Sequence, residues 1–588
     1  MSEEWISGTG PAFRSPSGAV DALRGITVGP GCRVQILADE EAQVVLAGDF
    51  RSPGNRTRAL LDAAWRGRWA ELTALDGSYW VVAQNPRARF VCGDVSGFRG
   101  IFYRQGGGDG VGESVWSTSA RRLAADHGAQ PDLIMLAARL AAGAEHWPHH
   151  TAYHNIRAVP GGFGLLQAAD GSQRLIDVSG IHPHRTLTDG APAFATALER
   201  AVHSRVEAAG TVGADVSGGL DSSTLAILAA EKGTIRAVTY TDPHTSTEDL
   251  RHARRVAGHI RTTLHIGEGG VGELPFAWSA GQAVTEQPAA ASLDTAQHAL
   301  YLQPAAGLPL HLTGHGGDVV LDGSSAVWTA MVQDGRRRVA RREVTAWART
   351  RNRSPRELWS AVTRTAATGY PGALLEAADR LETGVTDTRR PGVWTWCHLG
   401  QAAHWLTPKA RHRVAALLRE SARTTAEPDA RADLVEQRSS LRLIAADARD
   451  TIPLEASWNA RLVHPYLDNT VVRAAFAIAP AERHGTTVFK PLLGAALPRL
   501  SNWLTGRTTK GSFTRQLLTG LLHHQRQVAE LIATGPLVTA GLLDPEPALA
   551  ALTRAGTRAQ DLYDLHRLTM TCQWLTAHSN DRRMEEAC

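Results

Sequence analysis

Lysine is nearly absent from this sequence of 588 residues. Lysine and arginine together number 62, and only four of them are lysines, at Lys232, Lys409, Lys490 and Lys510. The remaining cations, 62 − 4 = 58, are arginines. A lysine kept at a reactive site would have a chemical reason to persist, because a compact ammonium and a planar guanidinium are not interchangeable. Compositional drift is the simpler explanation wherever no motif surrounds the lysine.

Cysteine is also scarce. Its five residues are odd in number and lack CxxC or Cys/His spacing, which argues against a disulfide framework or a zinc site. No apolar run reaches the roughly 18 residues that span a bilayer. The N-terminal segment MSEEWISGTG lacks the basic and apolar regions of a signal peptide. We therefore expect a cytoplasmic protein that does not engage a membrane.

Excess charge of either sign is missing as well. Lys+Arg 62 against Asp+Glu 58 gives +4, so no overall polyanion-binding signature exists and nucleic acid is not an expected partner. Residues 336–357 depart from this balance as a strongly basic amphipathic stretch, and Val393–Trp405 contains three tryptophans. Such segments can clamp a peptide or nucleic acid. A solvated helix face and core packing are the alternatives, and neither segment is assigned to the site.

The chain is long enough for more than one domain. From about residue 30 to 175, short period-two apolar runs separated by Gly, Pro and Asp predict a mostly antiparallel layer, with helical patches near 56–75 and 119–142. A polar stretch, 177–189, resembles a linker. After it, Ala/Leu/Arg-rich helices separated by single apolar strands predict an α/β layer followed by a mainly helical remainder.

The segment Val212–Ala230, VGADVSGGLDSSTLAILAA, carries the clearest chemical signal. An apolar run enters a Gly-rich turn, and Asp221 and two serines then open a helix with apolar spacing. Free backbone N–H groups and the positive end of the helix converge there, which predicts an anion site. The lysine of the GxxxxGK[ST] loop is absent. This loop therefore suits a reaction that expels pyrophosphate better than one that transfers a γ-phosphate.

SGGLDSS resembles the pyrophosphate loop of ATP pyrophosphatases, and most of all that of the asparagine synthetase family. Further segments resemble that family in the same order along about 300 residues: AVTYTD (237–242), EDLRHARRVAGHI (248–260), LTGHGGD (312–318), HPYLDN (464–469), FKPLL (489–493) and GRTTKGSF (506–513). One departure is Val319, which stands where the family has an acid after Asp318. The ordered series is more specific than any single motif.

The N-terminal part resembles the glutaminase domain of the same family, through residues 75–104, 115–119 and 154–166. The resemblance implies an α/β two-domain fold. An N-terminal-nucleophile αββα sandwich would occupy 1–180, with a linker at 181–190. An ATP-pyrophosphatase domain with a parallel sheet and large helical additions would occupy 191–588. Glutamine-using members expose a cysteine after Met1, whereas Ser2 stands here, so we expect a degenerate domain that supplies no ammonia.

The resemblance also implies a site for ATP and Mg²⁺. Its ATP-binding residues would be Val216, Ser217, Gly218, Gly219, Asp221, Ser222, Ser223, Tyr240, Thr313, Gly314 and Lys510. Asp221 and Asp318 would hold the metal, since hard oxygen ligands suit magnesium. Lys490 matches the lysine that contacts the α-phosphate and stabilises developing charge.

His315 occupies the position where asparagine synthetases have glutamate and β-lactam synthetases have tyrosine. An imidazole there could take a proton from the incoming amine, or could instead be structural or position the substrate. The resemblance is greatest to the lasso peptide cyclases, in length, in the insertion after Asp318 and in this histidine. These enzymes adenylate an Asp or Glu side chain of a core peptide and join it to the N-terminal amine, which avoids the entropic cost of a second substrate.

Implied partners are therefore a precursor core peptide, a leader peptidase and a leader-recognition protein. A β-lactam synthetase or an ammonia-dependent amide ligase is the alternative. The complete motifs at Asp221, Asp318 and Lys490 argue against the further alternative, a non-catalytic scaffold.

Overall fold

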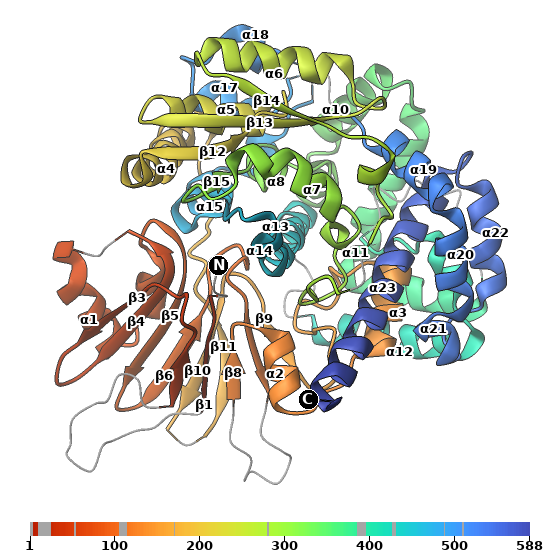
Figure 1. The fold of residues 1–588 in the computed structure, drawn as a ribbon, viewed down its shortest axis with the longest axis horizontal. Coiled ribbons are helices and arrows are strands. Elements are labelled where there is room, and N and C mark those ends of the chain that lie inside the picture. Colours follow the sequence, from red (N-terminus) through yellow and green to blue (C-terminus); the bar gives the residue numbers. More distant parts are fainter. Residues whose placement is uncertain are drawn as a thin grey trace.

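The fold combines one parallel sheet, two antiparallel sheets and many helices. The computed structural model describes residues 4–9, 25–51, 54–104, 115–169, 171–278, 281–384, 396–425, 431–486, 488–507 and 511–587. Figure 1 shows the antiparallel sheets in red and orange, the parallel sheet at the top and the blue C-terminal helices on the right. The predicted mixed α/β class is confirmed. Its assignment to the N-terminal-nucleophile and ATP-pyrophosphatase types stays a prediction, and Ser2 lies outside the described residues.

Both antiparallel sheets come from the N-terminal part of the chain. One has the order β2-β1-β8-β7-β9, with strands Ile6–Thr9 (β1), Ile26–Val28 (β2), Ile101–Arg104 (β7), Val115–Ser117 (β8) and Arg157–Val159 (β9). The other has the order β11-β10-β6-β5-β4-β3, with strands Val34–Ala38 (β3), Gln43–Phe50 (β4), Gly77–Asn85 (β5), Ala88–Cys92 (β6), Phe163–Ala168 (β10) and Gln173–Asp177 (β11).

Alternate residues of β4 face two different cores. Val44 and Leu46 pack beneath α1 (Thr57–Trp65), whereas Val45 lies in the core between the two sheets. A strand that is covered on both faces has a continuous apolar run, which explains the segment QVVLAG. On the far side, α2 (Ala120–Asp126) contacts β7 and β8. The two sheets are thus stacked between helices.

Five parallel strands form the centre of the C-terminal part. Their order is β14-β13-β12-β15-β16, and they span Thr211–Asp215 (β12), Thr234–Thr241 (β13), Leu264–Glu268 (β14), His311–Leu312 (β15) and Leu462–Val463 (β16). The chain builds outward from β12 in one direction and then returns to its other side with β15. Ligands of open α/β sheets bind beyond the carboxyl ends of the strands at such a reversal.

Helices α4 to α8 surround this sheet: Leu187–Ala209 (α4), Leu220–Ala230 (α5), Thr247–His259 (α6), Thr295–Leu302 (α7) and Gly317–Val320 (α8). Thr186 caps α4, its Oγ1 accepting a hydrogen bond from the backbone N–H of Asp189 at 3.2 Å. The last four residues of the expected 181–190 linker are therefore helical. The domain boundaries themselves stay a prediction.

The remaining helices cover the rest of the C-terminal part: Val327–Gln333 (α9), Arg337–Thr350 (α10), Pro355–Thr383 (α11), Pro408–Thr424 (α12), Ala432–Asp450 (α13), Ile452–Trp458 (α14), Asn469–Phe476 (α15), Pro480–Arg483 (α16), Pro491–Ala496 (α17), Asn502–Thr505 (α18), Thr514–His523 (α19), Gln525–Thr534 (α20), Pro536–Thr539 (α21), Pro545–Arg554 (α22) and Ala559–Ala587 (α23). The basic stretch 336–357 is α10 and the start of α11, and Trp405 is a core residue. Among the described residues, none of these helices has both the length and the apolar character needed to cross a membrane.

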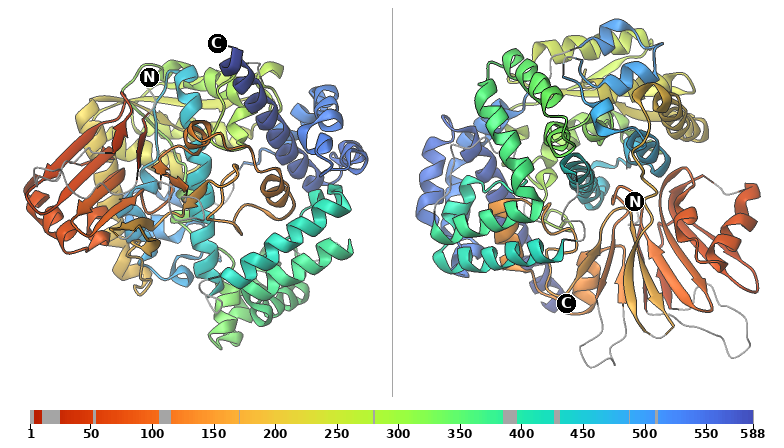
Figure 2. Two further views of the ribbon diagram at one scale, coloured as in Figure 1. Left: turned by 90° about the horizontal axis from the view of Figure 1, so that it is seen from below. Right: turned by 180° about the vertical axis from the view of Figure 1, so that it is seen from behind.

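One N-terminal helix, α3 (Leu133–Ala142), packs with the C-terminal helices. Asp132 caps it by accepting from the backbone N–H of Met135 at 3.0 Å. Its buried face joins a core that contains Trp405 and Trp574. Figures 1 and 2 show α3 in orange beside the blue helices. The predicted helical patch 119–142 is therefore two helices with different neighbours.

Arg205 of α4 connects the two parts through buried charges. Its guanidinium donates to Asp49 of β4 at 2.8 Å and to both oxygens of Asp468, just before α15, at 2.6 and 2.8 Å. Burial raises the pKa of Asp468 to about 6 even though Arg205 opposes the shift. The guanidinium outweighs burial at Asp49, whose pKa is lowered. The two parts are held in a fixed relation by these contacts.

Candidate active site

The SGGLDSS loop joins the carboxyl end of β12 to α5. Gly218 has a φ of 81°, and a Cβ there would collide with the carbonyl oxygen of Asp249. Gly219 stands at the N-cap of α5 and supplies no side-chain cap. The first N–H groups of the helix are therefore left for a ligand, together with the positive end of its dipole. This is the geometry that the sequence predicts for a phosphate group.

The serines of the loop have different surroundings. Ser217 Oγ and Ser222 Oγ lie 2.9 Å apart, and the N–H of Gly219 donates to Ser217 Oγ at 3.3 Å. Both hydroxyls line the turn. Ser223 is fully buried, and its Oγ has no hydrogen-bond partner among the described residues. The sequence assigns Ser223 to ATP, and this assignment stays a prediction.

The loop after β15 meets the first loop through glycines. A Cβ on Gly314 would lie 2.7 Å from the backbone nitrogen of Ser222, and a Cβ on Gly317 would lie 2.5 Å from Cγ of Asp221. Only glycine permits this approach. It brings Asp318, in the first turn of α8, next to Asp221 at the reversal in strand order.

Lys490 lies between these two carboxylates. Its Nζ donates to Asp221 at 2.5 Å and lies 2.8 Å from Oδ1 of Asp318. Lys490 is only 3% exposed and adopts a left-handed conformation, with φ 52°. Its backbone N–H donates to Oδ2 of Asp322 at 3.2 Å, while Oδ1 of Asp322 accepts from the N–H of Gly485 at 3.0 Å. Asp322, which sequence reasoning missed, therefore fixes the backbone that presents the ammonium.

The two carboxylates suit a magnesium ion that also binds phosphate. Both reach a single cation, the ammonium of Lys490. Among the residues that the structure describes, no group of three or more His, Cys, Asp or Glu side chains could hold a metal alone. Magnesium keeps several waters and is commonly held by one or two carboxylates together with substrate phosphates. Asp221 and Asp318 fit that role, and ATP would complete the coordination.

His315 faces an acid from α13. Its Nε2 lies 3.2 Å from Oδ2 of Asp447, and its backbone N–H donates to Oγ1 of Thr313 at 3.3 Å. The same Oγ1 lies 2.7 Å from Nδ1 of His464, whose pKa burial and His315 lower well below the usual value. Neutral His464 thus positions Thr313. Asp447 lies within ion-pair distance of the imidazole of His315, whose Nε2 makes no hydrogen bond to a described residue. Sequence reasoning identified His315 and Thr313 but not their partners.

The other predicted ATP contacts lie at or near the same sheet edge. The N–H of Val216, which is fully buried, donates to the carbonyl of Val238 at 2.8 Å and continues the sheet into the loop. Tyr240, near the end of β13, packs against Gly269, and burial and Asp242 raise the pKa of its phenol. Lys510 lies outside the described residues.

Arg507, from the same GRTTKGSF block as Lys510, holds the pyrophosphate loop. Its guanidinium donates to the carbonyl oxygen of Gly218 and to the carboxylate of Asp249. The side chain is almost fully buried. As one of 58 arginines it gives no compositional signal, and only the surrounding block could have identified it.

The comparison with protein families agrees with this geometry. A family model described as asparagine synthase matches residues 193–577, which include both loops and Lys490. The chain belongs to the asparagine synthase family. This family match covers more than half of the chain, from early α4 to late α23.

Outside the asparagine synthase family model, the likenesses are distant. No curated protein matches the chain. A solved glutamine phosphoribosylpyrophosphate amidotransferase from B. subtilis, in complex with ADP and GMP, is 10% identical, with 45% of this chain and 60% of that chain covered and a TM-score of 0.19. A structure described as the allosteric regulatory enzyme of purine biosynthesis is 11% identical, with coverages of 47% and 76% and a TM-score of 0.20. The chain thus spans 60% of the length of the first.

Proposed function

We propose that the protein is an ATP-dependent, AMP-forming C–N ligase that closes a macrolactam in a ribosomal peptide, as lasso peptide cyclases do. The observation that carries the ligase chemistry is the ammonium of Lys490 between Asp221 and Asp318, beside the pyrophosphate loop. Membership of the asparagine synthase family supports the same reaction class.

The first step is adenylation. An oxygen of the substrate carboxylate attacks the α-phosphorus of ATP, the bond to the bridging oxygen of pyrophosphate breaks, and an acyl-adenylate forms. The N-terminal N–H groups of α5 bind the departing pyrophosphate, and Lys490 stabilises the charge that develops on the α-phosphate. Magnesium, when bound, neutralises the triphosphate. Arg507 keeps Gly218 in the conformation that the anion needs.

The second step is amide formation. The amine attacks the acyl carbon, the C–O bond to AMP breaks, and one proton must leave the nitrogen. His315 is positioned to accept that proton, because Asp447 holds its Nε2 side at 3.2 Å and stabilises the imidazolium that results. An amine within the same substrate molecule removes the need for bound ammonia.

The substrate is proposed to be a core peptide whose Asp or Glu side chain is joined to its own N-terminal amine. A leader peptidase and a leader-recognition protein would supply that peptide. The main rival is a ligase for a small substrate, either a β-amino acid that closes a β-lactam or aspartate with ammonia. The two differ in the acceptor amine and share the adenylation step.

The decisive experiment incubates the full chain with ATP, Mg²⁺ and leader-free core peptides, and follows AMP by chromatography and the peptide by mass spectrometry. We expect stoichiometric AMP and a product lighter by one water. Adenylation is tested separately by exchange of labelled pyrophosphate into ATP. Exchange driven by aspartate or a small β-amino acid, with no cyclised peptide, would favour the small-substrate ligase. Absence of exchange with every carboxylate would overturn the ligase assignment.

A further inference from the structure

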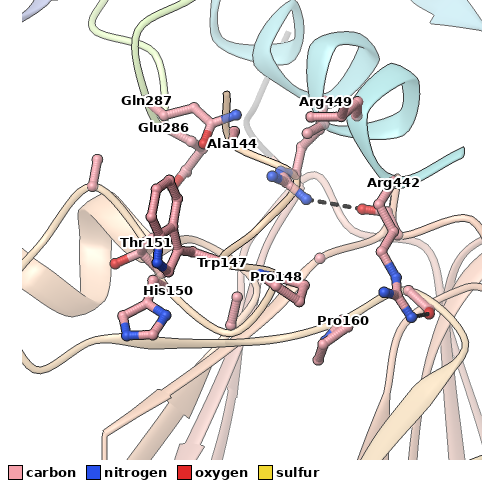
Figure 3. A pocket seen from close by; sticks show the side chains of 18 of the residues that line it. Ala144, Trp147, Pro148, His150, Thr151, Pro160, Glu286, Gln287, Arg442 and Arg449 are labelled. Carbon is pink, nitrogen blue, oxygen red and sulfur yellow. Dashed lines mark hydrogen bonds between the residues drawn. The ribbon is translucent and has the colours of Figure 1, made fainter. Parts of the chain in front are cut away.

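A cavity of about 110 Å³ lies between the N-terminal sheets and α13. Its walls come from the segment after α3, from strand β9 at the edge of the antiparallel five-stranded sheet and from the second half of α13. Figure 3 shows Arg449 and Arg442 descending from α13, with Trp147, Pro148 and His150 on the opposite wall. A water needs roughly 10–15 Å³ by this measure, so the cavity is large enough for a carboxylate-bearing side chain.

The charge of the lining is positive. Arg139, Arg442 and Arg449 all line the cavity. Of the two acids there, Glu286 is committed elsewhere, because its oxygens accept from Ser119 Oγ at 2.5 Å and from the N–H of Arg121 at 2.9 Å. Burial raises the pKa of the other acid, Glu145. Three guanidinium groups and two carboxyl groups thus line the cavity, which leaves its wall with a net positive charge.

Donors in the wall exceed acceptors. Arg449 donates through Nη1 to the carbonyl of Gly97 at 2.8 Å, and Arg139 donates to the carbonyl of His150 at 2.7 Å. Nε of both arginines and Nε1 of Trp147 are covered from solvent and have no acceptor among the described residues. Buried donors without partners are costly. Because these three atoms are covered, it is the positive charge of the lining arginines that favours an occupant with acceptor oxygens over an apolar one.

Helix α13 joins this cavity to the candidate active site. Arg442, Ala446 and Arg449 are spaced four and three residues apart, which puts them on one face of the helix, towards the cavity. Asp447, the partner of His315, follows Ala446 directly, about 1.5 Å further along the helix axis. Consecutive residues of a helix point about 100° apart, so the cavity and His315 flank neighbouring faces of α13, and a peptide that lies across this helix could contact both.

We propose that this cavity binds a carboxylate of the peptide substrate, away from the acyl group that is activated. The ligand class is an acidic peptide, held by Arg442 and Arg449 from α13 and by Arg139 from α3. The inference deepens the proposed function and rests on it for the source of the peptide. Charge-assisted hydrogen bonds from arginine to this carboxylate would fix the path that the bound peptide follows outside the active site.

Calorimetric titration of the full chain with triglutamate, in the absence of ATP, tests the site directly. We expect triglutamate to bind and uncharged triglutamine not to bind. Arg442→Gln should weaken binding about tenfold, the loss of one hydrogen bond to a charged group. Arg438→Gln is the matched control on the same helix, because Arg438 does not line this cavity, although it shares a neighbouring hollow with Arg442. Equal losses in the two variants, or no binding by the wild-type protein, would overturn the proposal.

A second variant removes space and leaves the charges intact. Ala446→Phe should fill the cavity from α13 and abolish triglutamate binding, while circular dichroism and the melting temperature stay unchanged. Unaltered binding in the folded Ala446→Phe protein would contradict the site. Free glutarate should not displace triglutamate at similar concentrations, and equal displacement would overturn the peptide as the source of the carboxylate.

The two proposals fail separately. A protein that binds triglutamate but catalyses no pyrophosphate exchange refutes the ligase and leaves the cavity assignment intact. A protein that exchanges pyrophosphate but ignores triglutamate refutes the cavity assignment alone.

Discussion

The Nζ of Lys490 lies 2.8 Å from Oδ1 of Asp318 and 2.5 Å from Oδ1 of Asp221. The ammonium therefore satisfies the same two carboxylates that are proposed to hold magnesium. Lys490 is held from behind by Asp322 through its backbone N–H.

Lys490→Arg should abolish most of the activity although it conserves charge. The planar guanidinium is too large for a position that is 3% exposed, and it cannot follow charge between two oxygens as the ammonium does. We expect pyrophosphate exchange to fall about 10²–10³-fold, as for the loss of one donor to developing charge. Lys409→Arg, on the first turn of α12, is the control and should be silent. Equal rates in the two variants would remove Lys490 from the mechanism.

Asp318 and Asp322 should respond differently to magnesium. Asp318→Asn weakens a proposed metal ligand, so the Mg²⁺ concentration for half-maximal pyrophosphate exchange should rise several-fold. Asp322→Asn removes one of two acceptors that hold the Lys490 segment, so it should lower the maximal rate without changing the magnesium requirement. Titration of both variants with Mg²⁺ separates the roles, and identical magnesium curves would contradict them.

His315 should act after the adenylate has formed. We expect His315→Ala to retain pyrophosphate exchange and to lose amide formation about 10²–10⁴-fold, the usual contribution of a general base. Asp447→Asn should give a smaller loss in the same step, because it removes the charge that stabilises the imidazolium. Single-turnover assays of both steps measure this. Loss of exchange in His315→Ala would indicate a structural or substrate-positioning imidazole instead.

Asp450 should destabilise the protein increasingly as pH rises. Burial raises its pKa to about 8, so the folded state keeps a proton that the unfolded chain loses near pH 4. The unfolded state therefore binds fewer protons between pH 4 and 8, and stability falls across that range. Asp450→Asn keeps an acceptor for Gln287 and removes the charge. Its melting temperature should match the wild type at pH 4, exceed it progressively up to about pH 8 and then level off.

Removal of Arg205 should be strongly destabilising. Arg205→Met leaves Asp468, which is 1% exposed, buried without its counter-ion, and breaking such a pair typically costs about 3–5 kcal/mol. Arg499→Ala is the surface control, since its pairs with Glu199 and Glu231 are exposed and exposed pairs contribute about 0–1 kcal/mol. Urea unfolding measures both changes. Comparable losses of unfolding free energy in the two variants would show that Arg205 stabilises the protein no more than an exposed ion pair does.

The pyrophosphate loop could be predicted from the sequence because its information is local. Ser217, Gly218 and Asp221 lie within five consecutive residues, between a strand and a helix. Lys490 could be predicted for another reason, since lysine is rare in this sequence and a family block surrounds it.

The supporting residues could not be found this way. Arg507 and Gly218 are 289 positions apart, and no periodicity connects them. Strands β15 and β16 have two residues each, too few for an alternating pattern. Asp447 shares its helix with several other charged residues, and only the three-dimensional fold selects it as the partner of His315.

The position of α3 has a consequence for how the chain comes apart. Residues 133–142 belong to the N-terminal part by sequence order, yet they are buried beside Trp574 of α23. Expressing residues 191–588 without the N-terminal part would expose the apolar side chains that α3 covers. We expect the two halves to unfold in one cooperative transition and neither to be obtainable alone. The N-terminal region would then be indispensable to the folding unit, whatever chemistry it carries.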